Sequence, residues 1–132
     1  MGCNCSEVPR GGQRTDFQYA VKVVCGSIPE GDKESPLPPG DYFTKVNIHN
    51  FSRCDCVTFR WKVALGHPRL RVGPISDFAD ATLCADEAME IDCKDMARRF
   101  GDQLPKTGPK SASHHEGWVV IESPVELDIV AV

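Results

Sequence analysis

The chemistry in this sequence is concentrated in its cysteines, of which there are seven in 132 residues. Four of them form two Cys-x-Cys pairs, Cys3 with Cys5 and Cys54 with Cys56. In an extended strand the two sulfurs of such a pair lie on one face, with their Cα atoms about 7 Å apart. Bonded cysteines have closer Cα atoms, so each pair is better suited to clamping another group than to bonding within itself.

A metal is one such group. Together, Cys3, Cys5, Cys54 and Cys56 would supply four thiolates, the ligand set of many structural zinc sites. Those sites usually have C-x₂₋₄-C spacing, and two C-x-C pairs depart from it. A zinc or iron module built on these four residues is therefore an alternative, while the leading expectation is a chain without a cofactor.

Disulfides at subunit contacts are the leading interpretation of the same four cysteines. Residues 1–16 are polar and are predicted to form a flexible arm that carries Cys3 and Cys5. Cys54 and Cys56 lie at a turn before a predicted strand, where the arm of a neighbouring subunit can reach. The odd number of cysteines leaves one thiol over if the rest pair within the chain. The remaining cysteines are expected to behave as small buried apolar side chains: Cys25, Cys84 and Cys93.

The N-terminus offers a second alternative, an acylated adaptor tethered to a membrane. Residues 1–6, Met-Gly-Cys-Asn-Cys-Ser, fit the N-myristoylation pattern and place two cysteines for palmitoylation. This start resembles that of dually acylated Src-type kinases. A membrane is expected as a partner only if these residues are acylated, since one acyl chain alone binds weakly.

Catalysis is not expected. The sequence has no G-x-S-x-G, P-loop, H-E-x-x-H or G-x-G-x-x-G motif. The acidic residues of the predicted strands alternate outward, which is typical of a solvated sheet face. An enzyme would need a concave face lined by His49, Glu90 or Asp92.

Charge and hydropathy exclude other classes of function. The net charge is −4 without a basic tract, which argues against nucleic acid as a partner. No apolar run approaches the roughly 18 residues that span a bilayer. Residues 1–14 lack the apolar stretch of a secretory signal, so the cytoplasm is the default expectation.

These cysteines must be positioned by a sheet, whose clearest element is the stretch 57–65. Val57, Phe59, Trp61, Val63 and Leu65 are apolar and alternate with polar or small residues. Alternation with a period of two over nine residues predicts a strand with one buried face. The rest of the chain is expected to pack on this face.

The other predicted elements are short. Strands are expected at 17–25, 41–51, 87–93, 118–122 and 125–132, and the strand at 41–51 is expected to form an antiparallel hairpin with the central strand. Residues 66–74 read as a turn-rich connection, followed by a short strand or turn around Ile75 and Phe78. Residues 102–117, including His114 and His115, are predicted to form a mobile loop.

The helix and the fold class follow from these elements. Asp92 is predicted to cap one short helix near residues 93–100, which Gly101 ends. Together the elements predict an all-β protein, an antiparallel β-sandwich or jelly roll of about 6–8 strands. Residues 17–132 are expected to form this single domain behind the arm.

Several stretches carry a resemblance to known proteins. A strand ending in Asn47-Ile48-His49-Asn50, the central strand, Glu90-Ile91-Asp92-Cys93 before a helix, and a closing Val-Val-Ile-Glu-Ser-Pro hairpin follow one another. This order resembles an uncharacterised group of small bacterial all-β proteins. The strand layout is also similar to the sensory rhodopsin transducer, a small β-sandwich that oligomerises.

A cysteine-bearing arm ahead of a β-sandwich also resembles, in organisation, the subunits of disulfide-linked spore appendages. These resemblances imply oligomerisation and binding rather than catalysis, and they assign no functional residues. The leading hypothesis is therefore a non-enzymatic, self-associating β-sandwich, a structural or binding subunit that forms a homo-oligomer. The arm and the Cys-x-Cys pairs would lie at its subunit contacts.

Overall fold

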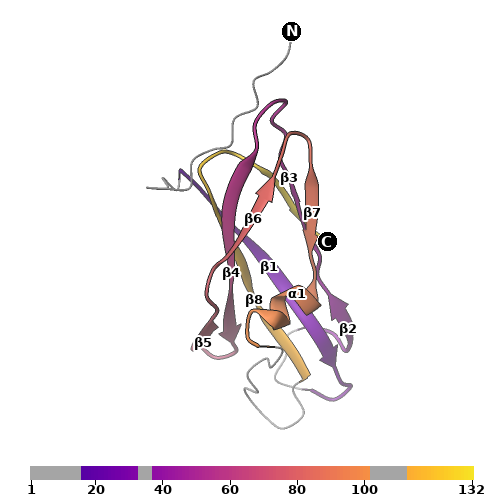
Figure 1. The fold of residues 1–132 in the computed structure, drawn as a ribbon. Coiled ribbons are helices and arrows are strands. Elements are labelled where there is room, and N and C mark those ends of the chain that lie inside the picture. The colour runs from indigo at the N-terminus through magenta and orange to yellow at the C-terminus, as the bar shows by residue number, and fades with distance from the viewer. Residues whose placement is uncertain (1–15, 33–36, 102–112) are drawn as a thin grey trace.

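Among the residues that the structure describes, two antiparallel β-sheets pack face to face, with one short helix beside them (Figure 1). The computed structural model describes residues 16–32, 37–101 and 113–132. The predicted arm, apart from Asp16, lies outside these ranges. The all-β, sandwich-like fold expected from the sequence is confirmed.

The larger sheet has six strands in the order β2-β1-β8-β4-β5, and β6 also pairs with β4. These strands are β1 (Phe17–Ile28), β2 (Gly40–Phe43), β4 (Val57–His67), β5 (Arg71–Ile75), β6 (Ala79–Leu83) and β8 (Ser113–Ser123). The smaller sheet has the order β7-β3-β9. Its strands are β3 (Val46–His49), β7 (Ala88–Ile91) and β9 (Asp128–Ala131).

The inner face of β4 forms the centre of the core. All five alternating apolar residues of the predicted strand are buried, and none exposes more than 7% of its surface. They pack in one cluster with the inner residues of β8 and, across the sandwich, of the smaller sheet: Val119, Ile121, Val46, Ile48 and Ile91. The alternating apolar residues all lie on the buried face of this strand, so the strand prediction is confirmed.

The predicted single strand at 41–51 is wrong, as is its hairpin with the central strand. The chain changes sheets here: β2 pairs with β1 in the larger sheet, whereas β3 lies between β7 and β9 in the smaller one. Thr44 fixes the crossing point. Its N–H donates to Val24 O (3.2 Å), and its Oγ1 accepts from Val24 N (2.9 Å). Alternation continues through the crossing, so the pattern alone did not reveal it.

Two further expectations need correction. The connection expected to be rich in turns contains the strand β5, and the short strand or turn expected after it is the strand β6. β5 is hard to recognise because it contains Gly73 and Pro74, which strands disfavour. Gly73 is needed there, since a Cβ atom would overlap the carbonyl group of Leu65. Finally, β8 begins at Ser113, so His114 and His115 lie on a strand and not in a loop.

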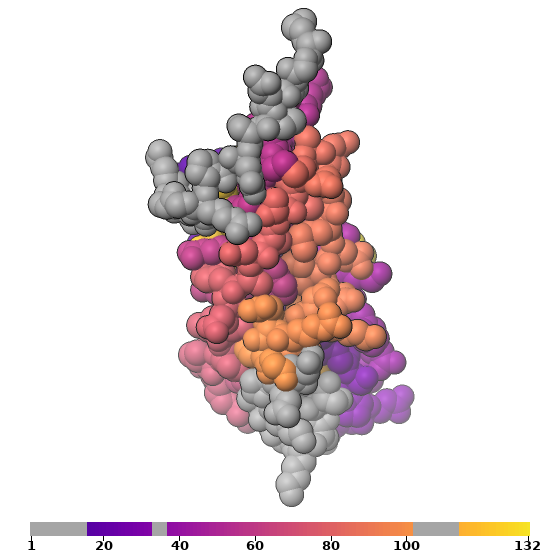
Figure 2. All heavy atoms as spheres, viewed as in Figure 1, coloured from indigo at the N-terminus to yellow at the C-terminus, as the bar shows by residue number. Residues whose placement is uncertain are grey.

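The helix α1 (Cys93–Arg98) forms where its cap predicted it. Asp92 Oδ1 accepts from Asp95 N (2.9 Å), and Asp95 Oδ2 accepts from Asp92 N (2.9 Å), which makes a reciprocal capping box. The bond from Asp95 N is the main cause of a lowered pKa at Asp92. Gly101 follows with a φ of 67°. Figure 2 shows α1 in orange at the surface, in the lower half of the view.

A disulfide joins α1 to the larger sheet. Cys93, the first residue of the helix, is bonded to Cys25 on the inner face of β1. Met96, which is buried, places its Sδ 3.9 Å from Cys25 Sγ. In the described ranges no helix is long and apolar enough to cross a membrane.

Phe59→Ala tests whether the inner face of β4 carries the stability of the fold. Phe59 is only 1% exposed, so its truncation should lower the free energy of unfolding by about 3–5 kcal/mol. Phe43→Ala is the matched control because Phe43 is 72% exposed, and it should change stability by less than about 0.5 kcal/mol. Urea unfolding of both variants measures the difference. Equal losses would contradict this assignment of the core.

Candidate functional site

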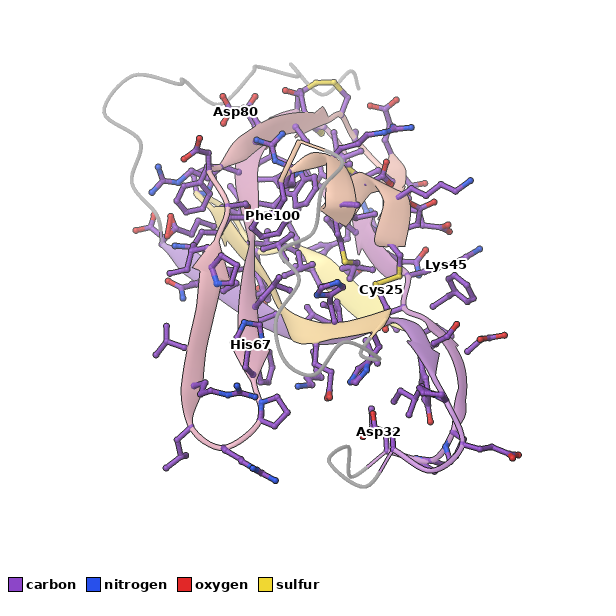
Figure 3. The ribbon with its side chains drawn as sticks, turned by 90° about the horizontal axis from the view of Figure 1, so that it is seen from below. Cys25, Asp32, Lys45, His67, Asp80 and Phe100 are labelled. Atoms are coloured by element: carbon purple, nitrogen blue, oxygen red, sulfur yellow. A yellow bond between two sulfur atoms is a disulfide. The ribbon has the colours of Figure 1, made fainter. Side chains whose placement is uncertain are left out.

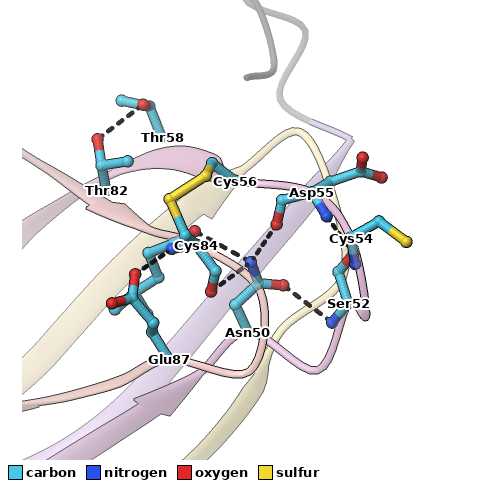
Figure 4. Close-up of a disulfide and its surroundings, with 10 residues drawn as sticks. Asn50, Ser52, Cys54, Asp55, Cys56, Thr58, Thr82, Cys84 and Glu87 are labelled. Carbon is cyan, nitrogen blue, oxygen red and sulfur yellow. Dashed lines mark hydrogen bonds between the residues drawn. A yellow bond between two sulfur atoms is a disulfide. The ribbon is translucent and has the colours of Figure 1, made fainter. Parts of the chain in front are cut away.

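The structure places two of the predicted cysteines, Cys54 and Cys56, at one end of the sandwich, where β4 begins. Cys56 is bonded to Cys84 (Figure 4). Cys54 is disulfide-bonded as well, and its partner is not among the described residues. Cys3 and Cys5 lie outside the described ranges. A zinc or iron site that used Cys56 would therefore require its bond to Cys84 to be reduced first.

The sequence did not predict these disulfides. Cys25, Cys84 and Cys93 were expected as buried thiols, and the structure contradicts this by pairing all three. The signal for one pair is the strand register: Val57 faces Leu83, so the residues just before and just after them face each other. That register depends on β6, which the sequence did not clearly show. Among the described residues, no group of three or more His, Cys, Asp or Glu side chains is placed to hold a metal.

The buried side chain of Asn50 organises this end of the molecule (Figure 4). Its Nδ2 donates to three carbonyl oxygens, those of Asp55 (2.8 Å), Leu83 (3.0 Å) and Cys84 (3.2 Å). Its Oδ1 accepts from Ser52 N (3.0 Å). One carboxamide thus joins the turn before β4 to the end of β6, which are the two segments that carry Cys56 and Cys84.

The backbone of Asn50 holds the next turn in place. Asp86 N donates to Asn50 O (2.9 Å), and Asn50 N donates to Glu87 O (2.9 Å). Glu87 Oε1 accepts from Cys84 N (2.6 Å), which closes the turn from within. As a result, Asp86 stands beside His49, the residue that precedes Asn50.

His49 is held between two carboxylates on the outer face of the smaller sheet. Its Nε2 lies 2.8 Å from Asp86 Oδ1, and its Nδ1 lies 3.0 Å from Asp128 Oδ2. Both ring nitrogens can donate only when the imidazole is protonated. The bond to Asp128, followed by that to Asp86, accordingly raises the pKa of His49 above its ordinary value of 6.5. We call these three residues the His49 clamp.

The clamp is surrounded by an acidic face. Besides the two carboxylates of the clamp, exposed acidic side chains come from β7 and from the segment before β9: Glu90 and Glu126. Two exposed apolar residues lie at the open edge of the same sheet, Val130 on β9 and Val132 just after it. Lys45 forms an ion pair with Glu90 (3.3 Å). This acidic face, Asp86, Glu90, Glu126 and Asp128 with the two valines, combines negative charge with an apolar strand edge.

The hairpin between β4 and β5 has the opposite charge and projects from the other end of the molecule (Figures 1 and 3). Its tip bears Arg69 and Arg71, together with Leu70, which is fully exposed, and Val72, which is 90% exposed. Arg69 and Leu70 have φ angles of 64° and 63°. Side chains other than glycine rarely adopt this left-handed conformation, which costs about 1–2 kcal/mol per residue. We call residues 69–72, with Ile75 on β5, the basic hairpin.

A hollow of about 460 Å³ lies at the base of this hairpin, on the outer face of the larger sheet. It is lined by residues of β1, β4, β8 and the hairpin turn: Lys22, Gly66, His67, Pro68, Arg69, Glu116, Gly117 and Trp118. Lys22 Nζ lies 3.5 Å from Glu116 Oε1 and 5.7 Å from the centre of the Trp118 ring. Nearby, burial is the main cause of a lowered pKa at His115.

The three residues that an enzyme would have needed are engaged separately. His49 is in the clamp, Glu90 pairs with Lys45, and the Asp92 carboxylate caps α1. The outward orientation of His49 follows from the alternation in its strand. Its partners were missed because Asp86 comes from a turn and Asp128 from a strand 79 residues away.

Removing either carboxylate should lower the pKa of His49, and Asp128→Asn should lower it more than Asp86→Asn, because the bond to Asp128 contributes most. Since folding raises this pKa, the clamp stabilises the protein fully below the unfolded value, and this contribution is lost as the pH rises through the folded value. NMR titration of the imidazole measures both effects. Asp80→Asn, which changes an exposed residue of β6, is the control. A wild-type pKa at or below 6.5 would refute the clamp.

Comparison with known proteins reveals no relative: no family model, curated protein or solved structure matches this chain. The similarity to a group of small bacterial all-β proteins and to the sensory rhodopsin transducer therefore remains a prediction. The function has to be inferred from the surfaces and the disulfides themselves.

Proposed function

We propose that this chain is a non-enzymatic β-sandwich subunit that associates with copies of itself. The observation that carries the proposal is the match between the basic hairpin and the acidic face. Each combines exposed apolar side chains with charge of one sign: Leu70, Val72 and the arginines on one, Val130, Val132 and the carboxylates on the other. Opposite charges steer two such surfaces together, and the apolar contact stabilises the complex.

The two surfaces lie on different sheets, so the basic hairpin of one molecule cannot contact the acidic face of the same molecule. The hairpin projects from an edge of the larger sheet, and β9 is an edge strand of the smaller sheet. Contact between different surfaces of identical chains is heterologous, and it produces rings or filaments according to the rotation between subunits. The left-handed backbone at the hairpin tip supports this role. The conformation is locally costly and exposes Leu70 to solvent, so it does not stabilise the core, and a contact with another subunit gives it a purpose.

The disulfides support an oxidising environment for this subunit. Cys25–Cys93 and Cys56–Cys84 would be hard to maintain in a reducing cytoplasm, where structural disulfides are rare. This favours a location outside the cytoplasm over the default expectation. In such a location the one cysteine left over when the other six are paired, Cys3 or Cys5 on the N-terminal arm, would add a covalent link to the non-covalent contact between subunits.

Light scattering at rising protein concentration tests the non-covalent contact. The wild type should exceed the monomer mass of 14.5 kDa in the micromolar to millimolar range. Leu70→Ser with Val72→Ser should weaken association by about tenfold or more, because both side chains lose their apolar contact. Phe43→Ser, at an exposed residue away from the hairpin, should associate like the wild type. A wild type that stays monomeric would overturn the proposal.

A charge exchange tests which surfaces meet. Arg71→Glu should weaken association, and adding Glu126→Arg should restore part of it, since the opposite charges again face each other. Arg71 and Glu126 are both exposed, so neither substitution removes a core contact. The effect should fade in high salt, which screens exposed charges. Failure of the double variant to recover would exclude this pairing of surfaces.

Non-reducing electrophoresis tests the covalent link. The oxidised wild type should give bands at multiples of the monomer mass that disappear with reductant. Cys3→Ser with Cys5→Ser should remove these bands, while its light-scattering mass at high concentration stays that of the oligomer. A single monomer band with and without reductant would reject inter-chain disulfides and leave the contact between basic hairpin and acidic face to be judged separately.

A further inference from the structure

The hollow beside Trp118 shares Arg69 with the basic hairpin but none of the hairpin's exposed apolar side chains. Strand register places Trp118 between Lys22 on β1 and Ala64 on β4. Two residues along β8, Glu116 faces Gly66 on β4. The indole therefore has a long cationic neighbour on one side and a small residue on the other. Leu70 and Val72, the apolar residues proposed to bind the next subunit, do not line the hollow.

Small residues keep the hollow open. A Cβ atom added at Gly66 would meet nothing within 4 Å, so the space above this residue is empty. Trp118 borders that space and is 45% exposed, whereas Trp61 in the core is 7% exposed. A half-exposed tryptophan on a sheet face contributes little to the core. Its flat apolar surface is instead available to a ligand.

The two polar groups beside the indole, Lys22 and Glu116, have opposite charges, and Arg69 also lines the hollow. Lys22 Nζ and Glu116 Oε1 form an ion pair, and Glu116 Oε2 also lies 3.3 Å from His114 Nε2. A donor and an acceptor thus stand side by side next to the indole. Beside the indole the Glu116 carboxylate opposes an anionic group, and Lys22, with Arg69 at the hairpin side of the hollow, opposes a cation. A neutral ligand that both donates and accepts hydrogen bonds suits this arrangement best.

We propose that the hollow binds a neutral sugar. A pyranose ring has a face of C–H groups that can stack on Trp118 and hydroxyl groups that can bond to Lys22 and Glu116. The volume of about 460 Å³ falls within the roughly 300–1,000 Å³ typical of small-molecule sites. The site is open on one side, so the affinity for a single sugar is weak. This is binding without chemical change of the sugar.

Saturation-transfer NMR with three neutral disaccharides, cellobiose, maltose and N,N′-diacetylchitobiose, tests the proposal. At least one should give a saturable signal at tens of millimolar or below, with the largest transfer to the C–H protons of one ring face. Gly66→Val should abolish this signal by filling the hollow, and Trp118→Ala by removing the stacking surface. Gln18→Ala, at an exposed residue elsewhere on β1, is the matched control and should bind like the wild type.

Thermal unfolding first establishes that each variant is folded. The inference fails if none of the three disaccharides gives a saturable signal, or if the signal survives in both Gly66→Val and Trp118→Ala, since binding would then lie elsewhere. It also fails if adenosine monophosphate binds more tightly than the disaccharides, because the site would then select an anion. The double variant Leu70→Ser with Val72→Ser separates the two proposals: it should lose association and keep sugar binding.

Discussion

Five alternating apolar side chains of β4 must be buried on the same face, and this requirement organises both sheets. On one side β4 pairs with β8, and on the other with β5 and β6 in turn. The smaller sheet closes over the buried face with its own apolar residues. Because the inner faces of both sheets pack against each other in the core, any binding surface must lie on the outer faces, the open edges or the turns. All the candidate surfaces of this protein lie there.

Asn50 shows how a single polar group can extend this order beyond the core. Its amide nitrogen has two hydrogens but contacts three carbonyl oxygens, so the bonds are shared. A buried amide is costly unless it is satisfied, and here its satisfaction requires two distant segments to meet. The meeting of Cys56 with Cys84 and the position of Asp86 beside His49 both follow. The sulfur chemistry and the acidic face therefore share one structural support.

Local patterns predicted much of the fold. The alternation of β4 and the cap of α1 depend on neighbours in sequence, and both were predicted correctly. The crossing between sheets was not, because Thr44 is held by Val24, twenty residues earlier. The candidate sites are harder to predict from the sequence than the fold is. The hollow at Trp118 needs Lys22 from β1 and Gly66 from β4, and only the strand register brings them together. The sequence shows which residues could bind or react, but the residues that lie beside them are determined by how the strands pair in the fold.

The two disulfides that join described residues are nested, with Cys56–Cys84 lying inside the loop that Cys25–Cys93 closes. A peptide bond broken anywhere between Cys25 and Cys93 therefore leaves the two fragments covalently joined. The same bond limits how far Cys25 and Cys93 can be pulled apart while the sulfurs stay oxidised. A row of such subunits would be a material whose extensibility depends on the redox potential of its surroundings.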